Sequence, residues 1–300
     1  MMKARITICT LMFVLSNYTL GYPVGVVEDA TQVPKVTKEI EDKQGTAEPE
    51  KQRGMVGEEG VLVPKVAEED RPFLSADVGF YSLYIWRGWQ LSKDSLVIQP
   101  SATLGYKGFS MNVWGNLDTN QFNIDKANWN ETDLTLSYER SFGPLSLGAG
   151  YIYYALDALD DQQEFYFTIG GDIILAPTFS VYKDITKVDS WYFNLGISHS
   201  FELPKGISLD LAASAGYYII NSRYTITADG DEQVGNNYSA LHDGVVSASL
   251  TIPFAKYFTC TPLIAYSFPL SSDAKNMLKT DSPSKKASHL FGGVTFSFCF

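Results

Sequence analysis

The sequence predicts an all-β fold, a transmembrane up-and-down antiparallel β-barrel of about 12 strands behind a disordered N-terminal linker. Three observations predict it. Apolar and polar residues alternate along most of residues 72–300, and a period of two indicates strands with one apolar face. The 18 Tyr, 18 Phe and 24 Gly suit a strand-rich wall with aromatic girdles. After the N-terminus no apolar run is long enough for a membrane helix, so a membrane span must use strands.

Residues 1–21 have the features of a secretory signal peptide. Lys3 and Arg5 form a basic start, and residues 6–15 form an apolar core. That core of about ten residues fits a signal and is too short to span a membrane as a helix. The sequence therefore predicts export and leaves the cleavage point open.

Residues 22–71 form a second segment, rich in Glu and Lys and poor in aromatic residues. Such a composition cannot bury enough apolar surface to fold alone, so we expect a disordered acidic periplasmic linker. The pattern Glu-Asp-x-x-x-Val-Pro-Lys-Val at 28–36 returns as Glu-Glu-x-x-x-Val-Pro-Lys-Val at 58–66. The repeat is either a duplicated spacer or a pair of extended motifs through which residues 28–71 dock a periplasmic partner.

Residues 72–300 are expected to form the barrel, and its strands follow from their apolar rows. In the first strand, Leu74, Val78 and Phe80 begin a row that continues through Tyr84 and Trp86. Each later row repeats the alternation after a turn or a loop. The expected strands fall within residues 73–87, 98–106, 109–116, 133–139, 145–153, 164–169, 179–181, 191–198, 207–217, 246–252, 258–268 and 290–300.

Short turns and longer polar loops are expected to alternate between these strands without exception. Outer-membrane barrels have this asymmetry, with short periplasmic turns and long external loops. Both ends of the barrel chain then lie on the short-turn side, and an even strand count closes the sheet. The expected short turns lie near 107–108, 142–144, 175–178, 203–206 and 254–257, and the long loops near 88–95, 118–130, 155–163, 183–190, 220–240 and 269–288.

A soluble β-sandwich or a lipocalin-like barrel is the structural alternative. Such folds bury their apolar rows inside. In this sequence the opposing rows are small and polar and include acidic residues. A soluble fold would have to expose the apolar, aromatic rows, so the membrane barrel is the preferred interpretation.

Three aromatic residues stand two apart at the end of the chain, namely Phe296, Phe298 and Phe300. A terminal aromatic strand of this kind resembles the closing strand of bacterial outer-membrane β-barrels. The resemblance implies that these residues form the signal read by the barrel assembly machinery. It also implies that the chain resides in the cell outer membrane.

A second resemblance rests on several short motifs near the start of the barrel. The run Tyr84-Ile85-Trp86-Arg87-Gly88 is followed by Gln99-Pro100-Ser101, Gly105-Tyr106-Lys107-Gly108-Phe109, Trp114-Gly115 and Asp133-Leu134-x-Leu136-Ser137-Tyr138. Together they resemble a family of uncharacterised, porin-like outer-membrane barrels of Gram-negative bacteria with a Tyr-x-Trp-Arg-Gly signature on the first strand. The match fades after about residue 154. It implies an outer-membrane barrel with no established substrate.

The charged residues indicate what a barrel lumen would hold. The formal net charge is −11, from 34 acidic and 23 basic residues, which argues against nucleic-acid binding. Arg87 is expected at the outer end of the first strand, on the polar row, where it could pair with a carboxylate. Arg87 either forms a structural ion pair that fastens the wall or acts as a constriction residue. The expected acidic lumen residues are Asp77, Asp133, Glu139, Glu164 and Asp210.

No pattern in the sequence indicates catalysis. The three His residues lie near neither a Cys nor one another, so no metal site or cofactor is predicted. His199 and Ser200 are adjacent and would face opposite sides of a strand, which does not make a Ser-His pair. We therefore expect no enzyme. Acidic residues in the loops, among them Asp118, Asp125 and Asp157, are either plain solvated charge or ligands for divalent cations that bridge lipopolysaccharide.

Two functional hypotheses follow from these expectations. The first is a narrow passive pore in the outer membrane for small polar solutes or cations, with acidic charge favouring cations. The second is a structural scaffold barrel without transport activity, whose linker docks a periplasmic partner. Outer-membrane lipid, lipopolysaccharide and the assembly machinery are the other expected partners.

Overall fold

The computed structural model describes the chain from Pro72 to Phe300, apart from residues 123, 158, 187–188, 222, 227–231 and 236. For 223–226 and 232–235 the description covers the backbone only. The expected signal peptide and linker, residues 1–21 and 22–71, lie outside the described residues.

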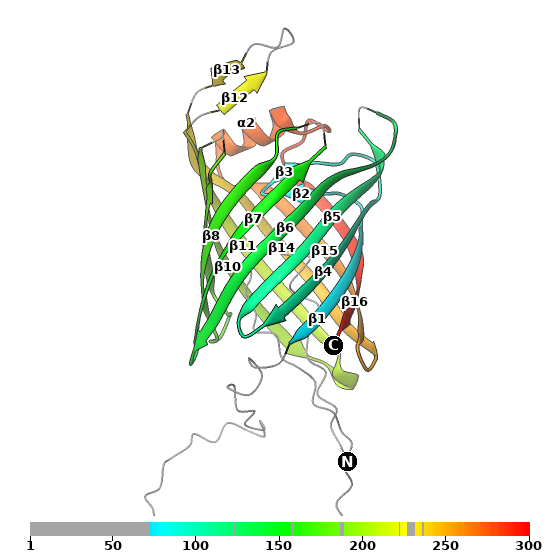
Figure 1. The fold of residues 1–300 in the computed structure, drawn as a ribbon. Helices are drawn as coiled ribbons and strands as arrows, with labels where there is room; N and C mark the ends of the chain where they lie inside the picture. The colour runs from blue at the N-terminus through cyan, green and yellow to red at the C-terminus, as the bar shows by residue number, and fades with distance from the viewer. Residues whose placement is uncertain are drawn as a thin grey trace, which may run out of the picture.

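The described residues confirm a closed, up-and-down antiparallel barrel of 12 strands (Figure 1). Each strand pairs with the next wall strand along the chain, and the first pairs with the last. The wall consists of β1 (Phe73–Tyr81), β4 (Val97–Tyr106), β5 (Phe109–Gln121), β6 (Lys126–Phe142), β7 (Leu145–Leu156), β8 (Gln162–Gly171), β9 (Thr178–Asp184), β10 (Ser190–Glu202), β11 (Ser208–Ile220), β14 (Tyr238–Ala255), β15 (Phe258–Pro269) and β16 (His289–Cys299).

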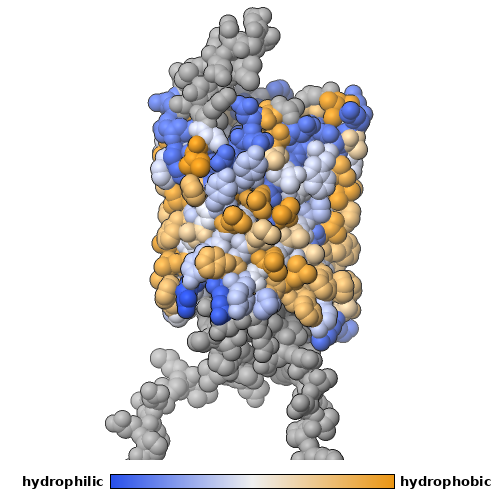
Figure 2. All heavy atoms as spheres, viewed as in Figure 1, coloured by the Kyte–Doolittle hydropathy of each residue, from blue (hydrophilic) through white to orange (hydrophobic). Residues whose placement is uncertain are grey.

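The expected apolar rows face outward and the polar rows face inward. On β6, the Leu136 side chain is 45% exposed, whereas Asp133 is buried. On β1, Leu74 is exposed and Asp77 is buried. Figure 2 shows hydrophobic residues over the middle of the wall and hydrophilic residues around the upper rim. The apolar rows therefore form an outer belt, as lipid contact requires.

The barrel closes where the two ends of the described chain meet. β1 and β16 pair antiparallel, with Asp77 opposite Ser297. Two further backbone hydrogen bonds join Leu74 and Phe300, one from each N–H to the other carbonyl. The pairing leaves the sheet without a free edge, so every wall strand has two hydrogen-bonded neighbours.

The connections divide the barrel into a lower and an upper rim. β1 begins and β16 ends at the lower rim in Figure 1, together with the turns 107–108, 143–144, 203–207 and 256–257. The short 3-10 helix η1 (Pro204–Gly206) lies in one of them. At the upper rim, β12 (Arg223–Ile226) and β13 (Glu232–Gly235) form a separate hairpin.

The expected strict alternation of short and long connections is wrong. Residues 118–130 were expected to form a loop, but β5 runs to Gln121 and β6 starts at Lys126. The upper connection 122–125 is thus shorter than the lower connection 172–177. Above the apolar belt both faces of a strand can be polar, so the hydrophobic alternation stops before the hydrogen-bonded ladder does.

The first strand also differs from expectation, because it ends at Tyr81. Tyr84 and Trp86 were expected on the outward apolar row. Tyr84 instead packs inside the barrel against Trp114, with ring centroids 5.7 Å apart. Residues 85–90 leave the wall and form a small hairpin from β2 (Ile85–Trp86) and β3 (Trp89–Gln90). We call it the inner hairpin.

Helix α2 (Ser272–Asp281) lies in the connection between β15 and β16 and was not expected. The Ser271 hydroxyl accepts a hydrogen bond from the Ala274 N–H, which caps the helix. Ala274, Met277 and Leu278 of the helix are buried. Among the described residues, no helix is long and apolar enough to cross a membrane.

Candidate functional site

The inner hairpin brings Arg87 into the lumen. Trp86 pairs with Trp89, and the two residues between them have positive φ angles, 46° at Arg87 and 82° at Gly88. Positive φ at both central positions is typical of a tight type I′ hairpin turn. A Cβ at position 88 would lie 2.9 Å from Asp243 Cβ and 3.0 Å from Leu278 Cδ1. Glycine therefore serves both the backbone conformation and the close packing under α2.

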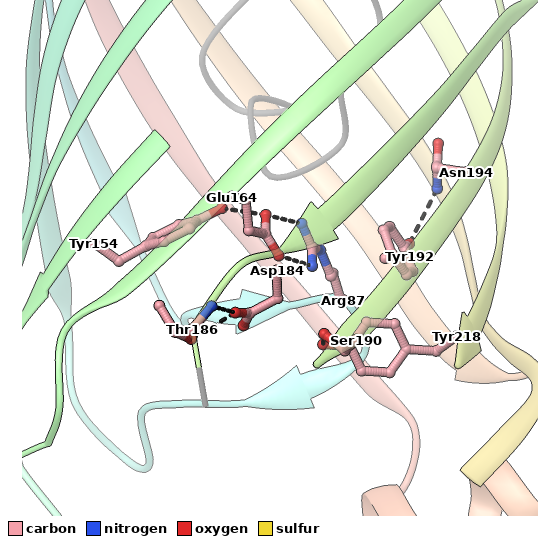
Figure 3. A network of polar contacts seen from close by, with 9 residues as sticks. All are labelled: Arg87, Tyr154, Glu164, Asp184, Thr186, Ser190, Tyr192, Asn194 and Tyr218. Carbon is pink, nitrogen blue, oxygen red and sulfur yellow. Dashed lines mark hydrogen bonds and ion pairs between the residues drawn. The ribbon is translucent and has the colours of Figure 1, made fainter. Parts of the chain in front are cut away.

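Arg87 meets Glu164 on β8 in a bidentate ion pair. Arg87 Nη1 donates to Glu164 Oε1 and Nη2 donates to Oε2, each at 2.7 Å. The Tyr154 hydroxyl, from β7, donates to Glu164 Oε2 at 2.8 Å. Both charged side chains are 3% exposed. Figure 3 shows the two planar groups facing each other edge to edge, which is the strongest geometry for such a pair.

Aromatic rings surround the same guanidinium. Arg87 Cζ lies 4.4 Å from the centroid of the Trp86 ring, 4.6 Å from that of Tyr182, 4.4 Å from that of Tyr192 and 6.0 Å from that of Tyr218. Cations are attracted to ring faces at such distances. We call these four residues the aromatic box. Glu164 therefore neutralises the buried cation, and the aromatic box surrounds it with ring faces.

Contacts with α2 and β14 hold the inner hairpin in place. Gln90 Oε1 accepts hydrogen bonds from the hydroxyls of Ser282 at 2.6 Å and Ser284 at 2.5 Å, just beyond α2. The Trp89 ring lies 4.4 Å from that of His242 on β14, centroid to centroid. The upper part of the lumen therefore holds the hairpin, with α2 packed against it.

The buried charges are unequal in sign. Among the residues whose side chains the structure describes, Arg87 is the one buried Lys or Arg. Several of the buried carboxyl groups have an oxygen with no hydrogen-bond partner among the described residues, including Oδ1 of Asp133 and Oδ1 of Asp210. A buried carboxylate without a partner is costly, so a cation nearby would stabilise the charged form of these groups. The eight buried carboxylates are Asp77, Asp118, Glu131, Asp133, Glu164, Asp184, Asp210 and Asp243.

The structure distributes the expected lumen residues over different depths. Glu164 lies beside Arg87, and Asp133 lies within Coulombic range of Glu164 and Glu131. Asp77 lies on β1, opposite Ser101 of β4. Asp210 lies near the lower rim, where it accepts hydrogen bonds from Ser208 and Thr251. Glu139, opposite Gly148 near the lower rim, is partly buried.

Arg87 itself is not on the polar row of the first strand, as the sequence suggested. It lies at the tip of the inner hairpin, because Arg87-Gly88 makes a turn rather than the end of a strand. Asp118 was expected in an exposed loop, but it lies in β5 and is fully buried. The corrected positions place more negative charge inside the barrel than the sequence indicated.

Several residues of the site were missed by the sequence analysis. Glu131 has the same parity as Asp133 and could have been found by extending the alternation. Asp243 Oδ1 accepts a hydrogen bond of 3.1 Å from the Tyr192 hydroxyl. The tyrosines of the box come from three neighbouring strands, and no local pattern brings them together. Among the described residues, no cluster of three metal-ligating side chains is found.

Comparisons with known proteins give similarity of shape only. No family model and no curated protein matches the chain, so the resemblance through the Tyr-x-Trp-Arg-Gly motif remains a resemblance. A chain from work on in-meso crystallization of membrane proteins is 10% identical with a TM-score of 0.42, covering 76% of this chain and 84% of that one.

Two further solved structures are similar at lower TM-scores. The transport unit of the autotransporter AIDA-I from Escherichia coli is 9% identical with a TM-score of 0.31, over 80% of this chain and 93% of that one. An anion-selective porin from Comamonas acidovorans is 9% identical with a TM-score of 0.28, over 77% of this chain and 99% of that one. These scores are too low to transfer any property to this chain.

Proposed function

We propose that the chain is an outer-membrane barrel that forms a narrow pore for small cations and cationic polar solutes. The outward apolar belt supports residence in a membrane, since a wall that exposes Leu136, Phe165 and Leu195 needs an apolar surrounding. A closed barrel also satisfies its backbone hydrogen bonds within the wall, as a membrane demands.

The observation that carries the cation preference is the imbalance of buried charge. Among the residues whose side chains the structure describes, eight buried residues carry a carboxyl group and one buried residue, Arg87, is basic. Two of the eight, Asp133 and Asp210, each have an oxygen without a hydrogen-bond partner among the described residues. Acidic side chains along a lumen attract cations and repel anions. Glu139, partly buried near the lower rim, adds to the same potential.

Conductance in planar lipid bilayers tests the pore. The purified full-length barrel, shown to be folded by its altered gel mobility before heating, should give steady single-channel steps in KCl. A folded barrel that stays silent over many insertions would contradict the pore.

One observation favours the second candidate, a scaffold barrel without transport. The inner hairpin occupies the upper part of the lumen with α2 packed against it, and small barrels are often filled by side chains. In that case the linker, residues 28–71, would carry the function by docking a periplasmic partner. A pull-down with the full-length barrel and with a variant lacking residues 28–71 should then recover a partner only from the first.

The remaining partners follow from position. Lipid would contact the apolar belt. Exposed Asp125 and Asp157 at the upper rim are candidates for divalent cations that bridge lipopolysaccharide. Phe296, Phe298 and Phe300 on the closing strand are candidates for recognition by the barrel assembly machinery.

A further inference from the structure

The site around Arg87 is built almost entirely by the wall. Five consecutive strands, β7 to β11, each contribute one side chain to it, and only Trp86 comes from the inner hairpin. The wall would therefore keep this arrangement if the Arg87 side chain moved away. The five wall residues are Tyr154, Glu164, Tyr182, Tyr192 and Tyr218.

We propose that this arrangement is a binding site for solutes that carry a guanidinium group, and that Arg87 occupies it as a tethered competitor. The inference rests on the proposed function, because it names the cationic solute that the lumen would recognise. The Arg87 side chain shows which chemistry fits, since its own head group fills the site.

The geometry favours guanidinium over ammonium. Glu164 receives two parallel N–H donors at 2.7 Å, which a planar fork supplies and a single ammonium does not. The rings of Trp86 and Tyr192 lie at 4.4 Å from the central carbon of that plane. A flat, weakly hydrated cation gains most from such ring contacts.

Neighbouring carboxylates allow the exchange of one cation for another. Asp133 lies within Coulombic range of Glu164 and has an oxygen without a hydrogen-bond partner among the described residues. Glu131, also buried, is near Asp133. These carboxyl groups therefore place further hydrogen-bonding oxygens beside the pair, which can hold a donor while one cation replaces another at Glu164.

The test removes the Arg87 head group by mutation and supplies the same atoms as a free solute. Arg87→Ala removes an ethylguanidinium group from the site, so N-ethylguanidinium is the matched probe, and the neutral N-ethylurea is its control. Binding is measured by titration calorimetry on the folded full-length barrel in detergent micelles. Arg87→Ala should bind N-ethylguanidinium and not N-ethylurea. Wild type should bind it about tenfold or more weakly, because Arg87 competes for the same place. Adding Glu164→Gln to Arg87→Ala should abolish binding.

Two results would overturn the proposal. If folded Arg87→Ala does not distinguish the two probes, the site does not recognise guanidinium. If Arg87→Ala binds the cation but wild type shows no binding at saturating probe, Arg87 is a permanent latch and not a competitor. If Arg87→Ala does not fold, refolding with N-ethylguanidinium should recover the barrel, and failure to recover it counts against the proposal.

The binding test is independent of the pore. Titration in micelles needs no current, so a silent barrel that binds the probe would refute the pore and keep the site. A barrel that conducts but does not bind the probe would refute the guanidinium site and keep the pore.

Discussion

Arg87 and Glu164 lie 77 positions apart in the sequence and face each other in the lumen through two hydrogen bonds of 2.7 Å. The pair joins the inner hairpin to the wall at β8. Both groups are buried, so removing one leaves the other buried without its charged partner.

Removing one partner of this pair should destabilise the barrel more than removing both. Arg87→Met and Glu164→Leu should each lower the free energy of unfolding by about 3–5 kcal/mol, because each leaves an uncompensated buried charge. The double variant should cost less than either single variant, because it leaves no unpaired buried charge. Urea unfolding of the folded barrel in micelles gives the three values.

The partly exposed ion pair of Lys183 and Asp189 supplies the control. Lys183→Met should cost about 0–1 kcal/mol, since solvent screens the pair. Equal costs for Arg87→Met and Lys183→Met would show that the buried pair does not fasten the hairpin.

The two faces of β6 should respond in opposite ways to a new charge. Leu136 points outward and is 45% exposed, whereas Thr135 next to it points inward, opposite Asn112 and Ile152. Leu136→Lys should destabilise the barrel by about 2–4 kcal/mol, because a Lys then faces lipid. Thr135→Lys should leave the fold nearly intact.

Cysteine labelling checks the same assignment. A membrane-impermeant thiol reagent should react with Thr135→Cys more readily than with Leu136→Cys in membranes. Reaction at 136 but not at 135 would mean that the faces are exchanged, as a register slip of one residue would do.

The terminal aromatic should matter for assembly more than for stability. The Phe300 side chain is 68% exposed, so its removal takes away little packing. Phe300→Ala should therefore lower the amount of barrel in the outer-membrane fraction and change the unfolding of purified barrel by less than about 0.5 kcal/mol. Unchanged abundance in the membrane would refute the assembly role. Phe142→Ala, at an exposed lower-rim position, is the control.

Protease added to intact cells should distinguish the two rims. Cleavage is expected between β11 and β14, at residues 221–237, if the upper rim faces the outside. The connection that holds α2 should resist, because Met277 and Leu278 are buried. Cleavage within residues 28–71 from outside would show that the orientation is inverted.

The wall could be predicted from the sequence because its signal is repeated. Apolar rows such as that of Leu134 and Leu136 recur along the whole barrel, so each row supports the assignment of the next segment as a wall strand. The prediction for the first strand was wrong at Tyr84 and Trp86, because their spacing continues the apolar row of that strand. They lie inside the barrel because Arg87 and Gly88 form a turn. The alternation of apolar and polar residues does not show that these two residues have positive φ angles.

Helix α2 and the aromatic box were not predicted, for two different reasons. The helix did carry a local signal, a Ser cap at Ser271 with Ala274, Met277 and Leu278 at helical spacing. The box carried none, because Tyr182, Tyr192 and Tyr218 meet only after strands β9, β10 and β11 pair. The sequence could suggest that Arg87 pairs with a carboxylate, but not which one.

The reversal potential in planar bilayers tests the cation preference most directly. Under a KCl gradient, wild-type channels should show a reversal potential of the sign that cation selectivity gives, since the buried carboxylates outnumber Arg87. The double variant Asp77→Asn/Asp210→Asn should shift it toward zero. Asp125→Asn, which removes an exposed carboxylate at the upper rim, should leave it unchanged. A reversal potential of anion-selective sign in wild type, or one that the double variant does not move, would contradict the proposed cation pore.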